Sequence, residues 1–228
     1  MTTSGTYTFN PSLGEVVLNA YARIQVRRTE IEVSHMQDAR MESNLLLAGP
    51  LGNLQPNLWT VDLQTVSLVQ GTATYTVPAE TIMILDAYIS YGNPTIDRMI
   101  FPISRTEYAS YPNKTQQGTP SVFWYDRLIA PTITLWSVPD GNSTYTLKYY
   151  RVRQIQDAEF TNAQTIEVPF LWLDAFTAGL AHRLSRIYAP QLEQIRKMDA
   201  EEAWSLAAKQ GVENVPMMIV PSIGGYFR

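Results

Sequence analysis

The chain has 228 residues, of which 45% are hydrophobic and 17% are charged, and this composition is typical of a globular protein with one large or two interleaved domains. It contains no cysteine, so disulfides, iron–sulfur clusters and zinc–thiolate sites are excluded. The formal net charge of −4 argues against a patch that neutralises nucleic-acid phosphates.

Two helices are predicted before residue 50. Each follows a capping-box signature, in which Ser or Thr precedes Glu by three residues: Ser12 with Glu15, and Thr29 with Glu32. Apolar residues then recur at helical spacing, so we expect helices at about residues 12–28 and 29–47. The Pro- and Gly-containing stretch 51–57 should be a connector.

The segment from Leu58 to Arg153 has the period-two apolar pattern of β-strands. Its strands are separated by Gly, Pro and Asn, as in an antiparallel block. In the last strand, Tyr145, Leu147 and Tyr149 alternate with polar residues. One face of the strand should therefore be buried and the other exposed to solvent, as in a sandwich or barrel.

Strand 121–127 differs because both of its faces are apolar, with Val122 and Trp124 on one and Phe123 and Tyr125 on the other. This pattern indicates either a central strand or contact with a neighbour. We take Phe123 and Tyr125 as candidate residues of an interface with a neighbour.

The last third of the chain returns to helices. Pro169 is suited to the start of a helix, and apolar residues follow at helical spacing up to Tyr188. Pro190 then begins a charged helix that ends near Gly211. The arm at 212–228 should be extended, because it contains two Pro and two Gly. Its apolar residues are candidates for an interface with a partner: Met217, Met218, Ile219, Val220, Ile223, Tyr226 and Phe227.

The predicted class is therefore α+β. An antiparallel bundle of two N-terminal and two C-terminal helices should comprise residues 1–57 and 154–211. An antiparallel β-sandwich or barrel, residues 58–153, is inserted between the helical pairs, and the extended arm follows.

Residues suited to catalysis are sparse. The two histidines, His35 and His182, lie on different predicted helices, and we expect both to be solvated. No G-x-S-x-G elbow or Gly-rich phosphate loop occurs in the sequence. We therefore expect no enzyme, no cofactor and no metal. We also expect neither a secretory signal nor a membrane span, since no apolar run approaches roughly 18 residues.

Several short sequence segments, in their order along the chain, resemble the head-to-tail adaptor proteins of short-tailed bacteriophages. This group includes tail tubular protein A and head completion proteins. The resemblance covers about residues 12–210. It is carried by the phrases at 67–78, 102–108, 118–126, 135–140 and 147–151, and by Val168-Pro169 before a helix with Leu180-Ala-His-Arg-Leu184. This chain has Ser137 where such proteins often have proline, and its last eighteen or so residues have no counterpart.

The resemblance implies a ring, usually of twelve copies, that docks on the portal protein and offers its other face to the tail nozzle or tube. The arm at 212–228 would then contact the portal or an adjacent subunit, and Phe123 and Tyr125 would contact a subunit or the tail. Genomic DNA would pass through the lumen without specific binding. The protein would be assembled in the host cytoplasm, would reside at the head-to-tail interface of the virion, and would have no membrane partner. The alternative is a peripheral virion β-module that binds host-surface glycans through its aromatic residues; a hydrolase with convergent acids is a third possibility.

Overall fold

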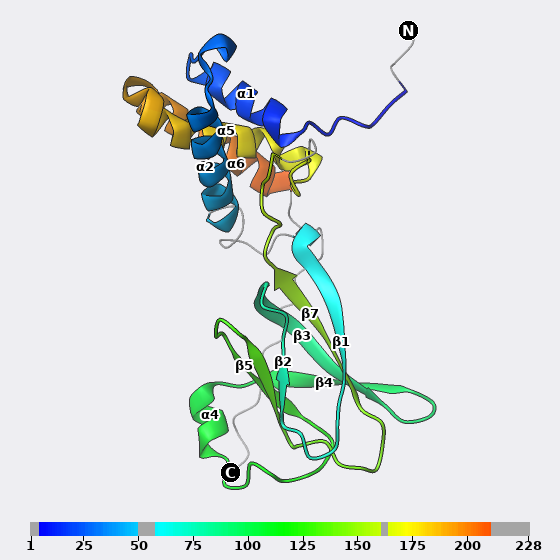
Figure 1. Ribbon diagram of the computed structural model, residues 1–228. Coiled ribbons are helices and arrows are strands. Elements are labelled where there is room, and N and C mark those ends of the chain that lie inside the picture. Colours follow the sequence, from blue (N-terminus) through cyan, green and yellow to red (C-terminus); the bar gives the residue numbers. More distant parts are fainter. Residues whose placement is uncertain (1–4, 50–57, 161–163, 211–228) are drawn as a thin grey trace.

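The computed structural model describes residues 5–49, 58–160 and 164–210, and within them the chain is a mixed α+β protein (Figure 1). The α-helices are α1 (Leu13–Arg23), α2 (Val33–Ala48), α4 (Arg105–Ser110), α5 (Leu173–Tyr188) and α6 (Glu193–Gln210). Short 3-10 turns are η1 (Arg28–Glu30), η2 (Leu58–Thr60), η4 (Phe170–Trp172) and η5 (Pro190–Leu192). The strands are β1 (Val61–Ser67), β2 (Thr74–Thr76), β3 (Thr81–Tyr91), β4 (Ile96–Pro102), β5 (Val122–Asp126), β6 (Thr132–Trp136) and β7 (Thr146–Arg153).

Helix α5 is the centre of the helical part, where it contacts α1, α2 and α6. Its residues Phe176, Leu180 and Leu184 follow one another at i+4 spacing and are fully buried. The predicted stripe ends there, because Ile187 is 49% exposed. The helical core is therefore built around one amphipathic helix that has neighbours on several sides.

The first predicted capping box is present at the start of α1. Glu15 N donates to Ser12 Oγ, and Ser12 N donates to Glu15 Oε2 at 2.9 Å. Leu13 N also donates to the carbonyl of Gln164 at 3.0 Å, which ties the start of α1 to the segment before α5. The second predicted box is wrong. Residues 28–30 form η1 instead, and α2 begins only at Val33 after Glu32 as N-cap.

The strands form one curled seven-stranded sheet in the order β1-β7-β3-β4-β5-β6-β2. Neighbouring strands are antiparallel, except that β4 and β5 run parallel where Phe101 and Pro102 pair with Val122 and Phe123. The expectation of a wholly antiparallel block is therefore wrong at this pair. The connection between the two strands contains α4, and such a crossover lets the second strand run in the same direction as the first.

The curled sheet encloses its own apolar core on its inner face. In β7, Tyr145 lies just before the strand and is 4% exposed, while Leu147 and Tyr149 are fully buried, as the alternation predicts. The other buried residues of this core come from β3, β4, β5 and β6 and from the segment after β2: Val77, Ala87, Ile89, Ile100, Phe123, Ile133 and Leu135. A second, separate cluster is formed mainly by the helices.

The outer face of β5 and β6 is covered by the crossover segment. Tyr108 of α4 stacks on Trp124 with ring centroids 5.6 Å apart, and Tyr111 stacks on Trp136 at 4.4 Å. The Nε1 of Trp136 donates to the carbonyl of Asn113. Both faces of β5 are thus covered within the same chain, and rings that could form a sugar platform have their faces occupied by one another.

This cover explains the two apolar faces of strand 121–127. Phe123 is 2% exposed in the sheet core, and the hydroxyl of the half-buried Tyr125 donates to the carbonyl of Thr81 at 2.9 Å. Phe123 therefore lies inside the sheet, and the assignment of both residues to an interface stays a prediction. The central-strand interpretation agrees with the structure.

Candidate assembly surfaces

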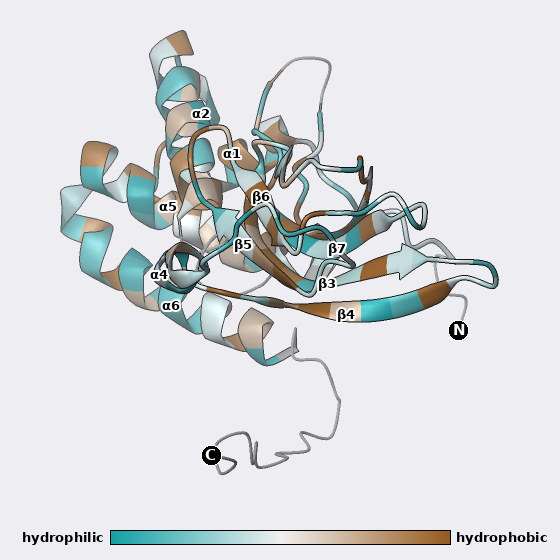
Figure 2. Cartoon of the chain, turned by 90° about the horizontal axis from the view of Figure 1, so that it is seen from below, coloured by the Kyte–Doolittle hydropathy of each residue, from teal (hydrophilic) through white to brown (hydrophobic). Residues whose placement is uncertain are grey.

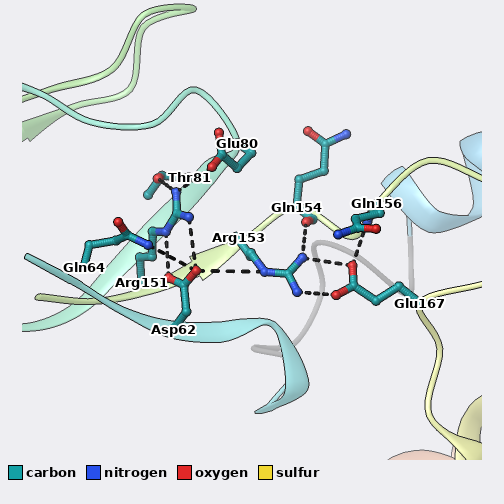
Figure 3. Close-up of polar contacts among 9 residues, drawn as sticks. All are labelled: Asp62, Gln64, Glu80, Thr81, Arg151, Arg153, Gln154, Gln156 and Glu167. Carbon is teal, nitrogen blue, oxygen red and sulfur yellow. Dashed lines mark hydrogen bonds and ion pairs between the residues drawn. The ribbon is translucent and has the colours of Figure 1, made fainter.

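A buried arginine anchors the end of the sheet that adjoins the helices (Figure 3). Arg151 is 4% exposed and makes a two-pronged contact with Asp62, with Nε–Oδ1 at 2.7 Å and Nη2–Oδ2 at 3.1 Å. Its third nitrogen donates to Glu80 at 3.1 Å and to the hydroxyl of Thr81 at 2.8 Å. The guanidinium thus joins β7 to β1 and to the start of β3.

A second arginine continues this network toward the helices. Arg153 donates through both terminal nitrogens to the carboxylate of Glu167, and its Nε lies 4.0 Å from Asp62. Glu167 also accepts from the backbone N of Gln156 at 3.0 Å. Because Glu167 lies in the segment that leads into α5, these contacts fix the exit from the sheet relative to the helical part (Figure 3).

Both carboxylates titrate below their usual range. The hydrogen bonds from Arg151 lower the pKa of Asp62, and those from Arg153 lower the pKa of Glu167. The two side chains are therefore ionised at neutral pH, and the network stays paired. The pairs therefore tie the sheet to the segment before α5 at neutral pH.

A groove of about 370 Å³ lies between α2, α5 and α6. Small and apolar residues line its interior: Leu46, Ala175, Gly179, Ala200 and Trp204. A Cβ at Gly179 would lie 3.1 Å from the side chain of Leu46, so the glycine permits the close approach of α2 and α5. The volume is within the usual range for binding pockets.

The rim of the groove carries cations that have acidic partners. Arg183 pairs with Glu42 at 3.1 Å, and Arg186 pairs with Glu193 at 3.1 Å. His182 also lines the groove, and burial lowers its pKa, so it is neutral at pH 7. The groove therefore combines an apolar interior with a rim of little net charge.

The outer face of the sheet carries a band of exposed apolar residues. Met99 and Phe101 of β4 are 56% and 63% exposed, and polar and apolar segments alternate along this strand in Figure 2. Met99 pairs with Tyr88 of β3, while Leu63 of β1 pairs with Tyr150 of β7. On the same face Tyr150 pairs with Asp86 and Tyr88 pairs with Lys148, so charged residues interrupt the band, as at the mixed surfaces that proteins use to contact one another.

Helix α6 exposes a third apolar feature. Ile195, Met198 and Leu206 are each more than half exposed. At 100° per residue, these three positions share one side of the helix, away from the groove residue Trp204. The stripe therefore faces outward from the helical part.

The remaining predictions have mixed outcomes. The arm candidates Met217, Met218, Ile219, Val220, Ile223, Tyr226 and Phe227 lie outside the described residues. The histidines are less solvated than expected: the ring of His35 stacks on Tyr188 at 4.6 Å, and the side chain of His182 is 14% exposed.

No metal-binding group is found among the residues that the structure describes, since no three His, Asp or Glu side chains there could hold an ion. Likewise, none of the described helices is both long and apolar enough to cross a bilayer.

Sequence reasoning missed the arginine network, although a signal was present. Arg151 has the same strand parity as Leu147 and Tyr149, both of which were expected to face the core. A charged residue at a core-facing position requires a buried partner. The identity of that partner was not predictable locally, because Asp62 is 89 positions away.

Comparison with known proteins identifies the family of this chain. No curated protein matches the chain significantly. The family model of the SU10 adaptor protein matches residues 14–216, which is most of the chain. This match agrees with the resemblance to bacteriophage head-to-tail adaptors. The chain therefore belongs to the SU10 adaptor protein family.

Proposed function

We propose that twelve copies of this chain form a ring that joins the capsid portal to the tail and surrounds the channel through which DNA leaves the head. Family membership carries this proposal, because it identifies the chain as a structural adaptor of a phage particle. The ring would be assembled in the host cytoplasm and retained in the virion.

The surfaces of the chain support a ring. A closed ring of identical copies needs two different surfaces on each copy that bind one another. The apolar band with Met99 and Phe101 and the outward stripe of α6 lie on different parts of the molecule. Either could contribute to contacts with a neighbour, the portal or the tail.

The charge supports passage of DNA without retention. The net charge is −4, and many of the described arginines are already paired with carboxylates, such as Arg23 with Asp174 and Arg40 with Glu159. A chain with a net negative charge lacks the overall excess of positive charge that retains nucleic-acid phosphates. We therefore expect DNA to pass through the lumen without being retained.

The arm at 212–228 is proposed to dock on the portal or on an adjacent copy. Its apolar residues could bind by strand addition or by insertion into a groove. Deletion of residues 212–228 should abolish docking on the portal. Particles that assemble normally from the truncated chain would contradict this part of the proposal.

Native mass spectrometry of the full chain, alone and mixed with a portal ring, tests the proposal directly. A complex of twelve copies on the portal is the expected result. A chain that stays monomeric and ignores the portal would overturn it. In that case a glycan array would test the alternative of a glycan-binding virion module.

A further inference from the structure

The N-terminal residues 5–11 form an arm with two exposed aromatic side chains. Tyr7 is 100% exposed and Phe9 is 70% exposed. Phe9 also lines a recess of its own chain together with Trp59 and Leu173, whereas Tyr7 is the more exposed of the two rings. The arm contains no charged residue.

The root of the arm is held in place. Ser12 forms a capping box with Glu15 and an isolated β-bridge with Thr165, and Leu13 N donates to Gln164. The arm therefore leaves the body in a defined direction. In Figure 1 it runs away from α2, which lies on the other side of the helical part.

The groove between α2, α5 and α6 is long enough for part of this arm. Its lining residues on α5 extend from Ala175 to Arg186, a length of about 16 Å along the helix axis. An extended segment of residues 5–11 spans about 23 Å. The volume of about 370 Å³ suits an aromatic side chain with part of its backbone.

The groove also matches the arm in chemistry. An uncharged aromatic segment loses little solvation on entering an apolar interior, and it does not compete with the paired charges on the rim. A strongly charged ligand would have to displace Glu42 or Glu193 from their arginines. The rim therefore favours a neutral occupant.

We propose that the N-terminal arm of one copy inserts Tyr7, with Phe9 beside it, into the α2–α5–α6 groove of a second copy. Because each copy directs its arm away from α2, the contact passes from copy to copy in one rotational sense. This inference rests on the proposed ring and names one of its subunit contacts.

Cross-linking of the full chain tests the contact. Because the chain has no native cysteine, only the introduced thiols can react. A Tyr7→Cys chain and a Lys197→Cys chain of different mass would be mixed, with and without a portal ring, and treated with a short thiol cross-linker. Lys197 lines the groove. The control partner is an Ile129→Cys chain, because Ile129 is 99% exposed on the β part.

Heterodimers with the Lys197→Cys chain should exceed those with the Ile129→Cys chain by about tenfold, the excess that a specific site gives over random collision. Equal yields would overturn the proposal. So would a Tyr7→Cys/Lys197→Cys double variant that cross-links only within one chain, since the arm would then occupy its own groove.

A second measurement separates this inference from the ring itself. Tyr7→Ala should keep the melting temperature, because this side chain is 100% exposed, but should weaken self-association by about 30-fold. Rings on the portal that form equally well with this variant and with the wild type would refute the arm contact and leave the adaptor function standing. Absence of rings with the wild type would refute the adaptor function instead.

Discussion

Replacing Glu167 by Gln should destabilise the protein in a pH-dependent way. The change keeps the shape of the side chain but removes the negative charge of the carboxylate, which accepts two hydrogen bonds from Arg153. The side chains of Arg153 and Glu167 are 21% and 25% exposed, so the pair lies between a surface and a buried ion pair. We expect a loss of about 1.5–2.5 kcal/mol in the free energy of unfolding at pH 7.

The sign of the pH effect follows from the lowered pKa of Glu167. A carboxyl with a lower pKa in the folded state stabilises the fold fully above its unfolded pKa, about 4.3, and this stabilisation is lost as pH falls through the folded pKa. The gap between wild type and Glu167→Gln should therefore be constant near neutral pH and shrink below about pH 4.

Urea unfolding followed by tryptophan fluorescence, repeated from pH 7 downward, measures this gap. Glu202→Gln is the matched control, because Glu202 is an exposed glutamate on α6. It should shift the unfolding free energy by less than about 0.5 kcal/mol. A gap of that small size for Glu167→Gln, or one that persists unchanged in acid, would refute the reasoning.

Further substitutions test the core and the surfaces. Leu180→Ala should cost about 2–5 kcal/mol by calorimetry or urea titration, because the side chain is fully buried in the helical core; a loss below about 1 kcal/mol would contradict that packing. Phe123→Asp should unfold the β part, seen by near-ultraviolet circular dichroism, whereas Met99→Asp should leave the fold intact and alter only assembly; the reverse pattern would refute the assignment of inner and outer faces. Tyr111→Ala should speed proteolysis within residues 105–115, since the stack on Trp136 is lost; an unchanged cleavage rate would argue against that stack.

Local signals predicted much of the fold. The capping box at Ser12 and the alternation of Tyr145, Leu147 and Tyr149 depend on neighbours within a few residues, and the structure reproduces both. The α+β class followed from the switch between helical and strand periods. These patterns are visible in sequence because the spacing itself is the physical cause of the structure.

One local signal failed, the second capping box at Thr29 and Glu32, and the other errors concern contacts between distant residues. Helix α4 spans only six residues, too few for a recognisable pattern, and it is held by stacking of Tyr108 on Trp124. Without knowledge of the fold, either apolar face of strand 121–127 looks like a surface for a partner, and the residues taken as candidates, Phe123 and Tyr125, lie on the inner face. The parallel pairing of β4 with β5 is equally non-local, because it depends on where the crossover returns the chain.

The candidate surfaces were only partly predictable. The exposed band with Met99 and Phe101 requires knowledge of which face of β4 turns inward, and Ile100 decides that by being buried. The groove requires α2, α5 and α6 to be packed together first. Tyr7 and Phe9 were visible as two aromatics before the first cap, but their full exposure is a property of the folded chain.

The pairing of β1 with β7 has a consequence for how this chain could be varied. Val61, at the entry to the sheet, lies directly opposite Val152, close to its exit. Paired strand residues are about 5 Å apart, so the chain enters and leaves the β part at neighbouring positions. Seen from the helices, the β part is therefore an insertion whose two ends adjoin. A tail of different shape could then be accommodated by exchanging everything between these two positions, while the helices and their order are retained.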